Sequence, residues 1–207
     1  TRITYTLILV VAMYISGERT FYYHPAQGGT ISFFTVILPS VVLSLWASAR
    51  SVNGKTVRRS LFNFFTPAAA AIALAVLAIK FVFSWLGSDI AYTQLAVTHA
   101  LVLTGLLLMV FVEPPVRSLA LGAELSGKWQ PTIAASVFYV LFNLITLIPL
   151  AQRLLRIAPL QSFQDYLLIW LITLVWAILV FGIWSILWSE RFKMTKSRTK
   201  GRMFQKE

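Results

Sequence analysis

The chain has 207 residues, of which 58% are apolar and only 12% are charged, and its formal net charge is +11. Soluble domains of this size do not carry so much apolar sequence, and several apolar runs here are long enough to cross a bilayer. The composition therefore predicts an all-α, polytopic transmembrane helix bundle. Because the sequence has no cysteine, disulfides, thiolate metal sites and thiol catalysis are excluded.

Six membrane segments are expected along residues 1–189, followed by a basic tail at 190–207. They lie at about residues 3–15, 30–49, 64–86, 90–112, 131–151 and 163–188. At about 1.5 Å per residue the first segment is too short for a hydrocarbon core of about 30 Å, so we interpret it as a truncated span. Pro67 and Pro131 suit the first turns of the third and fifth segments, Asp89 caps the fourth, and Ser162 with Asp165 resembles a capping box for the sixth.

Basic residues are distributed unequally between the two sides of this arrangement. The loops at 50–63 and 113–130 and the tail together hold 13 Lys and Arg residues, whereas the opposite loops hold Arg19, Arg153 and Arg156. Because cytoplasmic loops are enriched in Lys and Arg, the tail and the 50–63 loop are predicted to be cytosolic. We expect the tail to contact anionic lipid, and we do not expect nucleic acid as a partner.

The second segment carries a proline in its middle. Pro39 has no N–H, so the carbonyl of Thr35 loses its helical donor, and Ser32 and Thr35 fall on the proline's face of a regular helix. Transporters build ion sites from such broken helices. The alternative is a structural kink in which both hydroxyls bond back to their own helix.

Few ionisable side chains lie deep within the apolar runs, and no Asp or Glu is among them, because Asp89 and Asp165 stand at helix starts. Arg2 is either a fixed cation lining a transport path or a boundary residue reaching lipid headgroups, and Tyr5 lies one turn away on the same face. His99, with Gln94 and Thr98 at helical spacing, could relay protons or help to bind an ion. The alternative for His99 is a hydrogen bond to a neighbouring helix, as we also expect for Asn143 and Thr146.

Four stretches, in this order, resemble the C-terminal half of the membrane domain of bacterial cation-transporting P-type ATPases, closest to the group that includes the mycobacterial calcium-type pumps. TRITYTLIL (1–9) is similar to the start of their fifth helix, and SFFTVILPSVVLSL (32–45) to their sixth. RRSLFNFFTP (58–67) resembles the approach to the seventh helix, and DYLLIWLITLVW (165–176) resembles the tenth. The six segments would then be the fifth to tenth helices of that family.

The resemblance implies a longer parent chain with four more helices and the cytosolic domains that bind ATP and Mg²⁺. This fragment alone would hydrolyse no ATP and would hold no cofactor or resident metal. It would form part of the path of a transported cation, of which calcium is one candidate, in the bacterial plasma membrane with the C-terminus cytosolic. The 50–59 stretch would meet the missing phosphorylation domain.

Position by position, the resemblance is only partial. Thr35 and Pro39 match the family, Ser32 stands where calcium pumps have Asn, and Arg2 and Tyr5 stand where they have Asn and Glu. Val36 stands where they have the ion-binding Asp. With both carboxylates replaced, the calcium-pump type of second site is not implied, and Arg2 could act as a built-in counter-ion. The rival interpretation is a stand-alone six-helix membrane protein, either a small permease or a structural subunit.

Overall fold

The computed structural model describes residues 2–17, 20–46, 54–112 and 129–182. These residues are helical apart from short connections, which confirms the predicted all-α class. Four helices are long and apolar enough to cross a membrane, and α6 with α7 gives a fifth span if this bent pair counts as one. The first segment forms a shorter apolar helix, α1 (Arg2–Ser16). The described residues therefore form a helical membrane bundle with four to five spans and one short first helix, which agrees with the prediction of six segments of which the first is too short to span.

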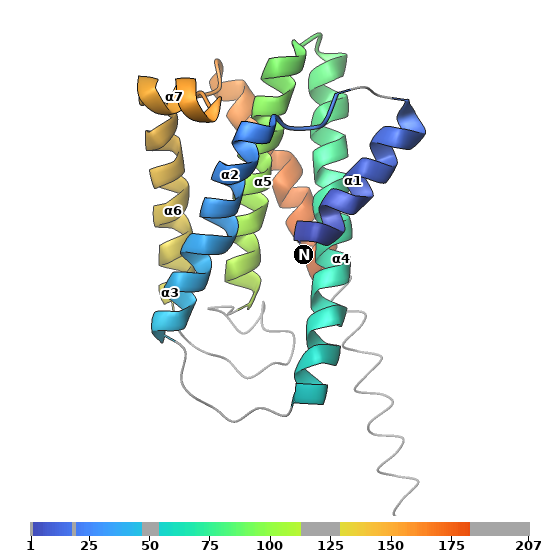
Figure 1. Ribbon diagram of the computed structural model, residues 1–207, viewed down its shortest axis with the longest axis vertical. Coiled ribbons are helices and arrows are strands. Elements are labelled where there is room, and N and C mark those ends of the chain that lie inside the picture. The colour runs from blue at the N-terminus through green and yellow to red at the C-terminus, as the bar shows by residue number, and fades with distance from the viewer. Residues whose placement is uncertain (1, 18–19, 47–53, 113–128, 183–207) are drawn as a thin grey trace, which may run out of the picture.

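Helix α4 (Gly54–Trp85) is the longest in the bundle, and α1 packs against it (Figure 1). Our predicted start near Pro67 is wrong, because the helix begins ten residues before the expected residue 64. Residues 55–63 contain no Gly or Pro to end the helix, and prolines are tolerated inside membrane helices when neighbouring groups satisfy the freed carbonyl. Small side chains let other helices approach α4 closely, and the buried ones are Ala68, Ala69, Ala71, Ala73 and Ala75.

Helix α2 (Pro25–Ser32) begins five residues earlier than the sequence analysis placed the second segment. His24 caps it: the His24 Nδ1 accepts a hydrogen bond from the Ala26 N–H at 3.2 Å. The side chain of Gln27 returns to the His24 N–H at 2.8 Å, which completes a capping box. Pro25 occupies the first turn, where its missing N–H costs nothing. The helix continues through η1 (Phe33–Ile37) into α3 (Leu38–Trp46).

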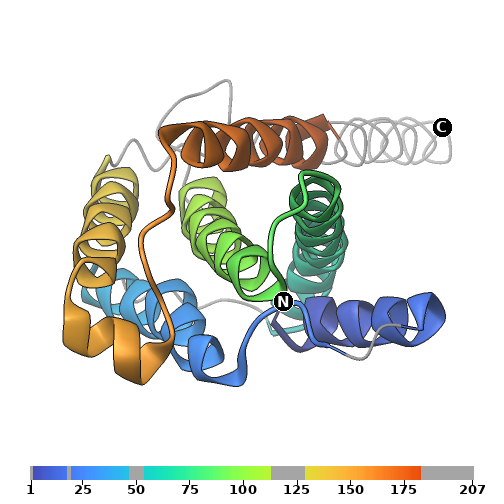
Figure 2. The same cartoon turned by 90° about the horizontal axis from the view of Figure 1, so that it is seen from above.

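Helix α5 (Ile90–Val112) has the predicted bounds and stands in the middle of the bundle (Figure 2). The Asp89 carboxylate accepts the Ile90 N–H at 2.8 Å, which confirms Asp89 as the cap. Helix α5 is buried on most sides, as expected for a helix that is apolar all round. Any polar side chain on α5 therefore needs a partner inside the protein.

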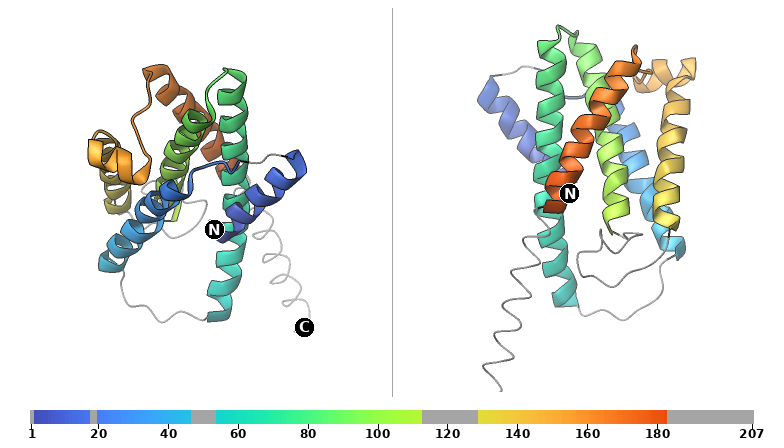
Figure 3. Two further views of the ribbon diagram at one scale, coloured as in Figure 1. Left: turned by 45° about the horizontal axis from the view of Figure 1, so that its top comes forward. Right: turned by 180° about the vertical axis from the view of Figure 1, so that it is seen from behind.

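The predicted fifth segment, 131–151, is wrong as one straight helix. It is divided into α6 (Gln130–Thr146) and α7 (Pro149–Leu155), which meet at 92°. The proline ring disfavours helical backbone at the preceding residue, and Ile148 is accordingly extended. The Gln152 side chain donates to the Thr146 carbonyl at 2.9 Å and satisfies one exposed acceptor at the break. As a result, α7 lies across the end of the bundle (Figure 3).

The last described helix, Phe163–Gly182, slants across the back of the bundle (Figure 3). The Ser162 hydroxyl accepts the Gln164 N–H at 3.1 Å, so Ser162 is a cap as predicted. Asp165 departs from the predicted capping box, because its carboxylate accepts a hydrogen bond from the Tyr92 hydroxyl at 2.5 Å. The basic tail and the predicted end of the sixth segment at residue 188 lie outside the described residues.

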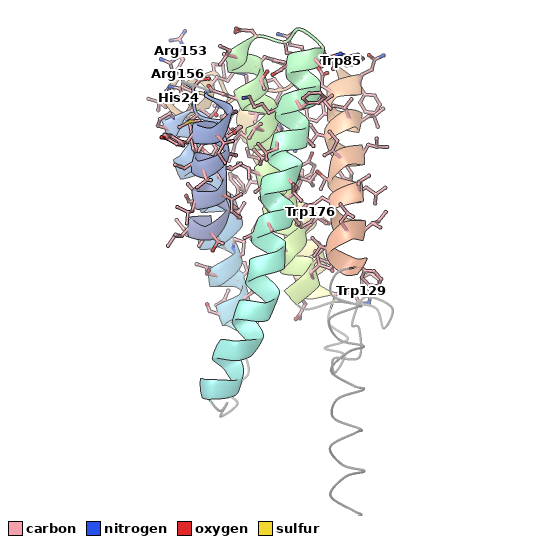
Figure 4. All side chains as sticks on the ribbon, turned by 90° about the vertical axis from the view of Figure 1, so that its right-hand side faces the viewer. His24, Trp85, Trp129, Arg153, Arg156 and Trp176 are labelled. Carbon is pink, nitrogen blue, oxygen red and sulfur yellow. The ribbon has the colours of Figure 1, made fainter. Side chains whose placement is uncertain are left out.

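Side chains suited to a membrane surface lie at both ends of the bundle. In Figure 4, His24, Trp85, Arg153 and Arg156 lie at one end, and Trp129 lies at the other. Indole rings prefer the interface because they are apolar with one polar N–H. This pattern is consistent with helices that run across a bilayer.

Candidate functional site

The second membrane span is interrupted next to Pro39, where the sequence analysis predicted a break, and the interruption is a π-helical turn. In η1 the Leu38 N–H donates to the Phe33 carbonyl, a bond across five residues. The Phe34 carbonyl would take Leu38 as its α-helical donor or Pro39 as its π-helical donor. Leu38 is bonded to Phe33 and Pro39 has no N–H, so Phe34 has neither. Single π-turns of this kind are frequent at functional sites.

The sequence analysis predicted that the Thr35 carbonyl lacks a helical donor, and the structure adds the Phe34 carbonyl, one residue earlier. Pro39 removes the α-helical donor of Thr35, as predicted. The Leu38–Phe33 bond of the π-turn and the missing N–H of Pro39 together leave Phe34 without an α- or π-helical donor. The turn also inserts one residue into the helical repeat. Ser32, before the turn, and Pro39, after it, consequently lose the shared face that a regular α-helix would give them.

The hydroxyls of Ser32 and Thr35 are bonded to their own helix. Ser32 Oγ donates to the Gly28 carbonyl at 2.6 Å, and Thr35 Oγ1 donates to the Ile31 carbonyl at 2.7 Å. Each oxygen keeps lone pairs that can still accept a hydrogen bond or bind a cation. These two bonds are the ones expected for a purely structural kink, but the Ser32 and Thr35 hydroxyl oxygens can still act as ligands.

Ser32 and Thr35 have different surroundings. Ser32 lines a groove of about 420 Å³ whose other walls are Phe21, Tyr23, Pro25, Gly28 and Gly29. The Thr35 side chain instead packs against α5 at Gly105. In the broken span, Ser32 therefore lies at a groove, whereas Thr35 lies in a contact between two helices.

Tyr5 and Arg2 are carried by α1, whose main contact is with α4. Tyr5 is buried in the core. Arg2 begins α1, but its side chain lies outside the described part of the structure. Figure 1 shows α1 and α3 diverging on different sides of the bundle. The predicted grouping of Arg2 and Tyr5 with Ser32 and Thr35 therefore stays a prediction.

His99 lies at a different junction from the π-turn. It is 1% exposed, and its Nε2 lies 3.0 Å from the Ala158 carbonyl. Its ring meets Phe142 of α6 edge-on at 4.9 Å between centroids, and Tyr166 of the last helix at 5.6 Å. Gln94 and Thr98, which helical spacing grouped with His99, bond elsewhere: Gln94 to the Phe21 carbonyl and Thr98 to Gln27.

Residues 156–161, here called the strap, connect α7 to the last helix and are held by side chains from three helices. All four bonds are to the strap backbone, and each is 2.7–3.1 Å long. The Gln27 amide donates to the Arg156 carbonyl, and the His99 ring bonds the Ala158 carbonyl. The hydroxyls of Tyr166 and Tyr92 accept the N–H groups of Leu160 and Gln161, respectively. An extended segment has no helical partners of its own, so these side chains supply the hydrogen bonds that its buried backbone needs.

Gln27 was missed by the sequence analysis, although it has the most hydrogen-bond partners in this network. It is 3% exposed, and its oxygen accepts both the His24 N–H and the Thr98 hydroxyl. Its Nε2 donates to the Arg156 carbonyl at 2.7 Å. The local signal was His24-Pro25 followed by Gln27 at the third helical position, which is the spacing of a capping box.

Asn143 and Thr146 do not join helices in the way we predicted. Asn143 donates to the Tyr139 carbonyl, and the Thr146 hydroxyl donates to the Asn143 carbonyl, both within α6. Among the described residues, no three His, Cys, Asp or Glu side chains come together as a metal site. A cation in the broken span would therefore be held by hydroxyl and carbonyl oxygens.

The fold and the π-turn before Pro39 define the class of protein, which is a helical membrane bundle with one interrupted span. The chain matches no family model, no curated protein and no solved structure. The sequence resemblance and the geometry of the π-turn are the features of this chain that bear on its function.

Proposed function

We propose that this chain is the C-terminal membrane portion of an ATP-driven cation pump, located in the bacterial plasma membrane with its basic tail in the cytosol. The observation that carries the proposal is the π-turn before Pro39, which leaves the Phe34 carbonyl without a helical donor. In hydrocarbon such a carbonyl needs protein, water or an ion as its partner. The turn also packs against α5 at the centre of the bundle.

The ligands at the break are neutral oxygens. Carbonyls and the lone pairs of the Ser32 and Thr35 hydroxyls suit a hard cation, but they supply no charge to offset its dehydration. The remaining ligands would come from helices of the parent chain, and its cytosolic domains would bind ATP and Mg²⁺. In this arrangement the present chain contributes one wall of the ion path and the structural support behind it.

The Pro39→Ala variant of the full-length protein tests the proposal. Alanine restores an N–H that can occupy a freed carbonyl, so we expect ATP-driven cation uptake into inverted membrane vesicles to fall strongly while membrane insertion stays normal. Pro131→Ala is the matched control, because Pro131 lies in the first turn of α6, where the N–H has no helical partner. Uptake equal to that of the unmodified protein would remove Pro39 from the ion path.

The size of the native polypeptide tests the parent-chain part of the proposal. An antibody against residues 191–207 should detect a membrane protein several times larger than 23.3 kDa. A band near that mass would refute the pump and favour the stand-alone six-helix permease or structural subunit. The back-bonded hydroxyls of Ser32 and Thr35 are the observation that favours this second candidate, because they are also what a purely structural kink needs.

A further inference from the structure

Helix α7 carries exposed apolar side chains at one end of the bundle. Helix α6 packs along the membrane-spanning α5, and α7 meets α6 at 92°, so the axis of α7 follows the plane of the membrane (Figure 1). Leu150 and Leu154 stand one turn apart on the same face of α7 and are 66% and 67% exposed. Leu147 and Ile148, at the bend, are exposed as well. Such a face is unfavourable in water and stable at the boundary between lipid headgroups and acyl chains.

Two arginines accompany this apolar face. Arg153 lies in the last turn of α7, Arg156 is its C-cap, and both side chains are exposed. Figure 4 shows both at the same end of the bundle. The acidic side chains that the structure describes are engaged elsewhere, since Asp89 caps α5 and Asp165 bonds to Tyr92. The described part of the chain therefore supplies no carboxylate partner for either guanidinium.

Both the backbone and the location of Arg156 are unusual for an arginine. Its φ of 53° is in the left-handed region, where glycine is the usual helix-ending residue and a side chain is strained. The Gln27 amide holds this residue by donating to its carbonyl at 2.7 Å. Arg153 and Arg156 also lie on the side opposite the predicted cytosolic loops, where the positive-inside rule calls for few cations. A role for the guanidinium groups themselves accounts for both observations.

We propose that α7 lies in the headgroup layer of the bilayer and that Arg153 and Arg156 bind the phosphate of an anionic phospholipid. A guanidinium offers paired N–H donors that match two phosphate oxygens. Leu150 and Leu154 reach the upper acyl carbons, while the longer arginine side chains extend to the phosphates. An anionic lipid is preferred to phosphatidylcholine, because the choline group carries a cation of its own. This proposal does not depend on the pump function.

Fluorescence quenching by labelled lipids tests the lipid site. The chain has no cysteine, so Leu154→Cys accepts a single bimane fluorophore on the exposed face of α7. The protein is reconstituted in equimolar phosphatidylglycerol and phosphatidylcholine, with a nitroxide on an upper acyl carbon of one lipid or of the other. We expect both nitroxide lipids to quench the bimane, and the phosphatidylglycerol one to quench it at least about twofold more strongly.

Two arginine variants identify the groups that select the lipid. Arg153→Gln with Arg156→Gln should abolish the preference for phosphatidylglycerol, whereas Arg153→Lys with Arg156→Lys should keep most of it, because the charge remains. Val137→Cys, at an exposed position in the middle of α6, is the matched control, and both lipids should quench its label equally. The proposal is overturned if neither lipid quenches the label at position 154, which would place α7 in water or against another protein segment. It is equally overturned by equal quenching from the two lipids, or by a preference that survives the glutamine pair.

Discussion

Thr35 of η1 and Gly105 of α5 meet so closely that position 105 has no room for a side chain. A Cβ at position 105 would overlap Thr35 Cγ2 and would lie 2.7 Å from Thr35 Cβ. Both contacts are far closer than van der Waals contact, so the glycine is what lets the π-turn rest on the central helix. Small residues have this role at membrane helix contacts generally.

Gly105→Ala should therefore push η1 away from α5. We expect the free energy of unfolding to fall by about 1–3 kcal/mol, the usual cost of overpacking, in an SDS titration from mixed micelles. Thr35→Ser removes the nearest atom and should partly restore stability in the double variant. Gly29→Ala is the control, because nothing lies within 4 Å of a Cβ at that position. Equal stability of Gly105→Ala and Gly29→Ala would contradict the close contact.

Gln27→Met keeps the length of the side chain and removes its polar atoms. The Arg156 carbonyl, the Thr98 hydroxyl and the His24 N–H each lose a partner. Because an orphaned buried group costs about 1–3 kcal/mol, we expect the variant to be less stable by about 2–4 kcal/mol. Hydrogen exchange should also become faster in the strap. Gln161→Met, at an exposed side chain, should leave both measurements unchanged.

Tyr92→Phe tests the outer end of the same network. The Tyr92 hydroxyl donates to Asp165 and accepts the Gln161 N–H at 3.0 Å, so its removal affects the first turn of the last helix and the strap together. We expect a loss of about 1–2 kcal/mol in unfolding free energy. Tyr14→Phe is the matched control, since Tyr14 is 87% exposed. A loss of the same size in both variants would show that the network contributes nothing specific.

The lack of cysteine in the sequence makes the predicted topology easy to test. Ser88→Cys lies in the turn between α4 and α5, and Lys200→Cys lies in the basic tail. With the tail in the cytosol, a membrane-impermeant maleimide should label Ser88→Cys in intact cells and should label Lys200→Cys only after permeabilisation. Labelling of both positions in intact cells would contradict the predicted topology.

The sequence alone predicted the features that depend on local chemistry. The apolar runs determined the all-α membrane class, and the bounds of α5 followed from the Gly87–Asp89 turn and the proline pair after residue 112. Local signals also misled at three places. The basic stretch at 55–63 was interpreted as a loop although it is helical, the capping box at His24 was missed, and the bend at Pro149 was interpreted as part of one span.

Only the tertiary structure decided which polar side chains meet. Helical spacing grouped Gln94, Thr98 and His99, yet each bonds to a different segment, because neighbouring positions on a central helix face different neighbours. The π-turn was likewise invisible in the sequence: Pro39 predicts a break, but how the freed bonds redistribute depends on packing against Gly105. The sequence shows which polar residues need hydrogen-bond partners, and the fold determines which groups become those partners.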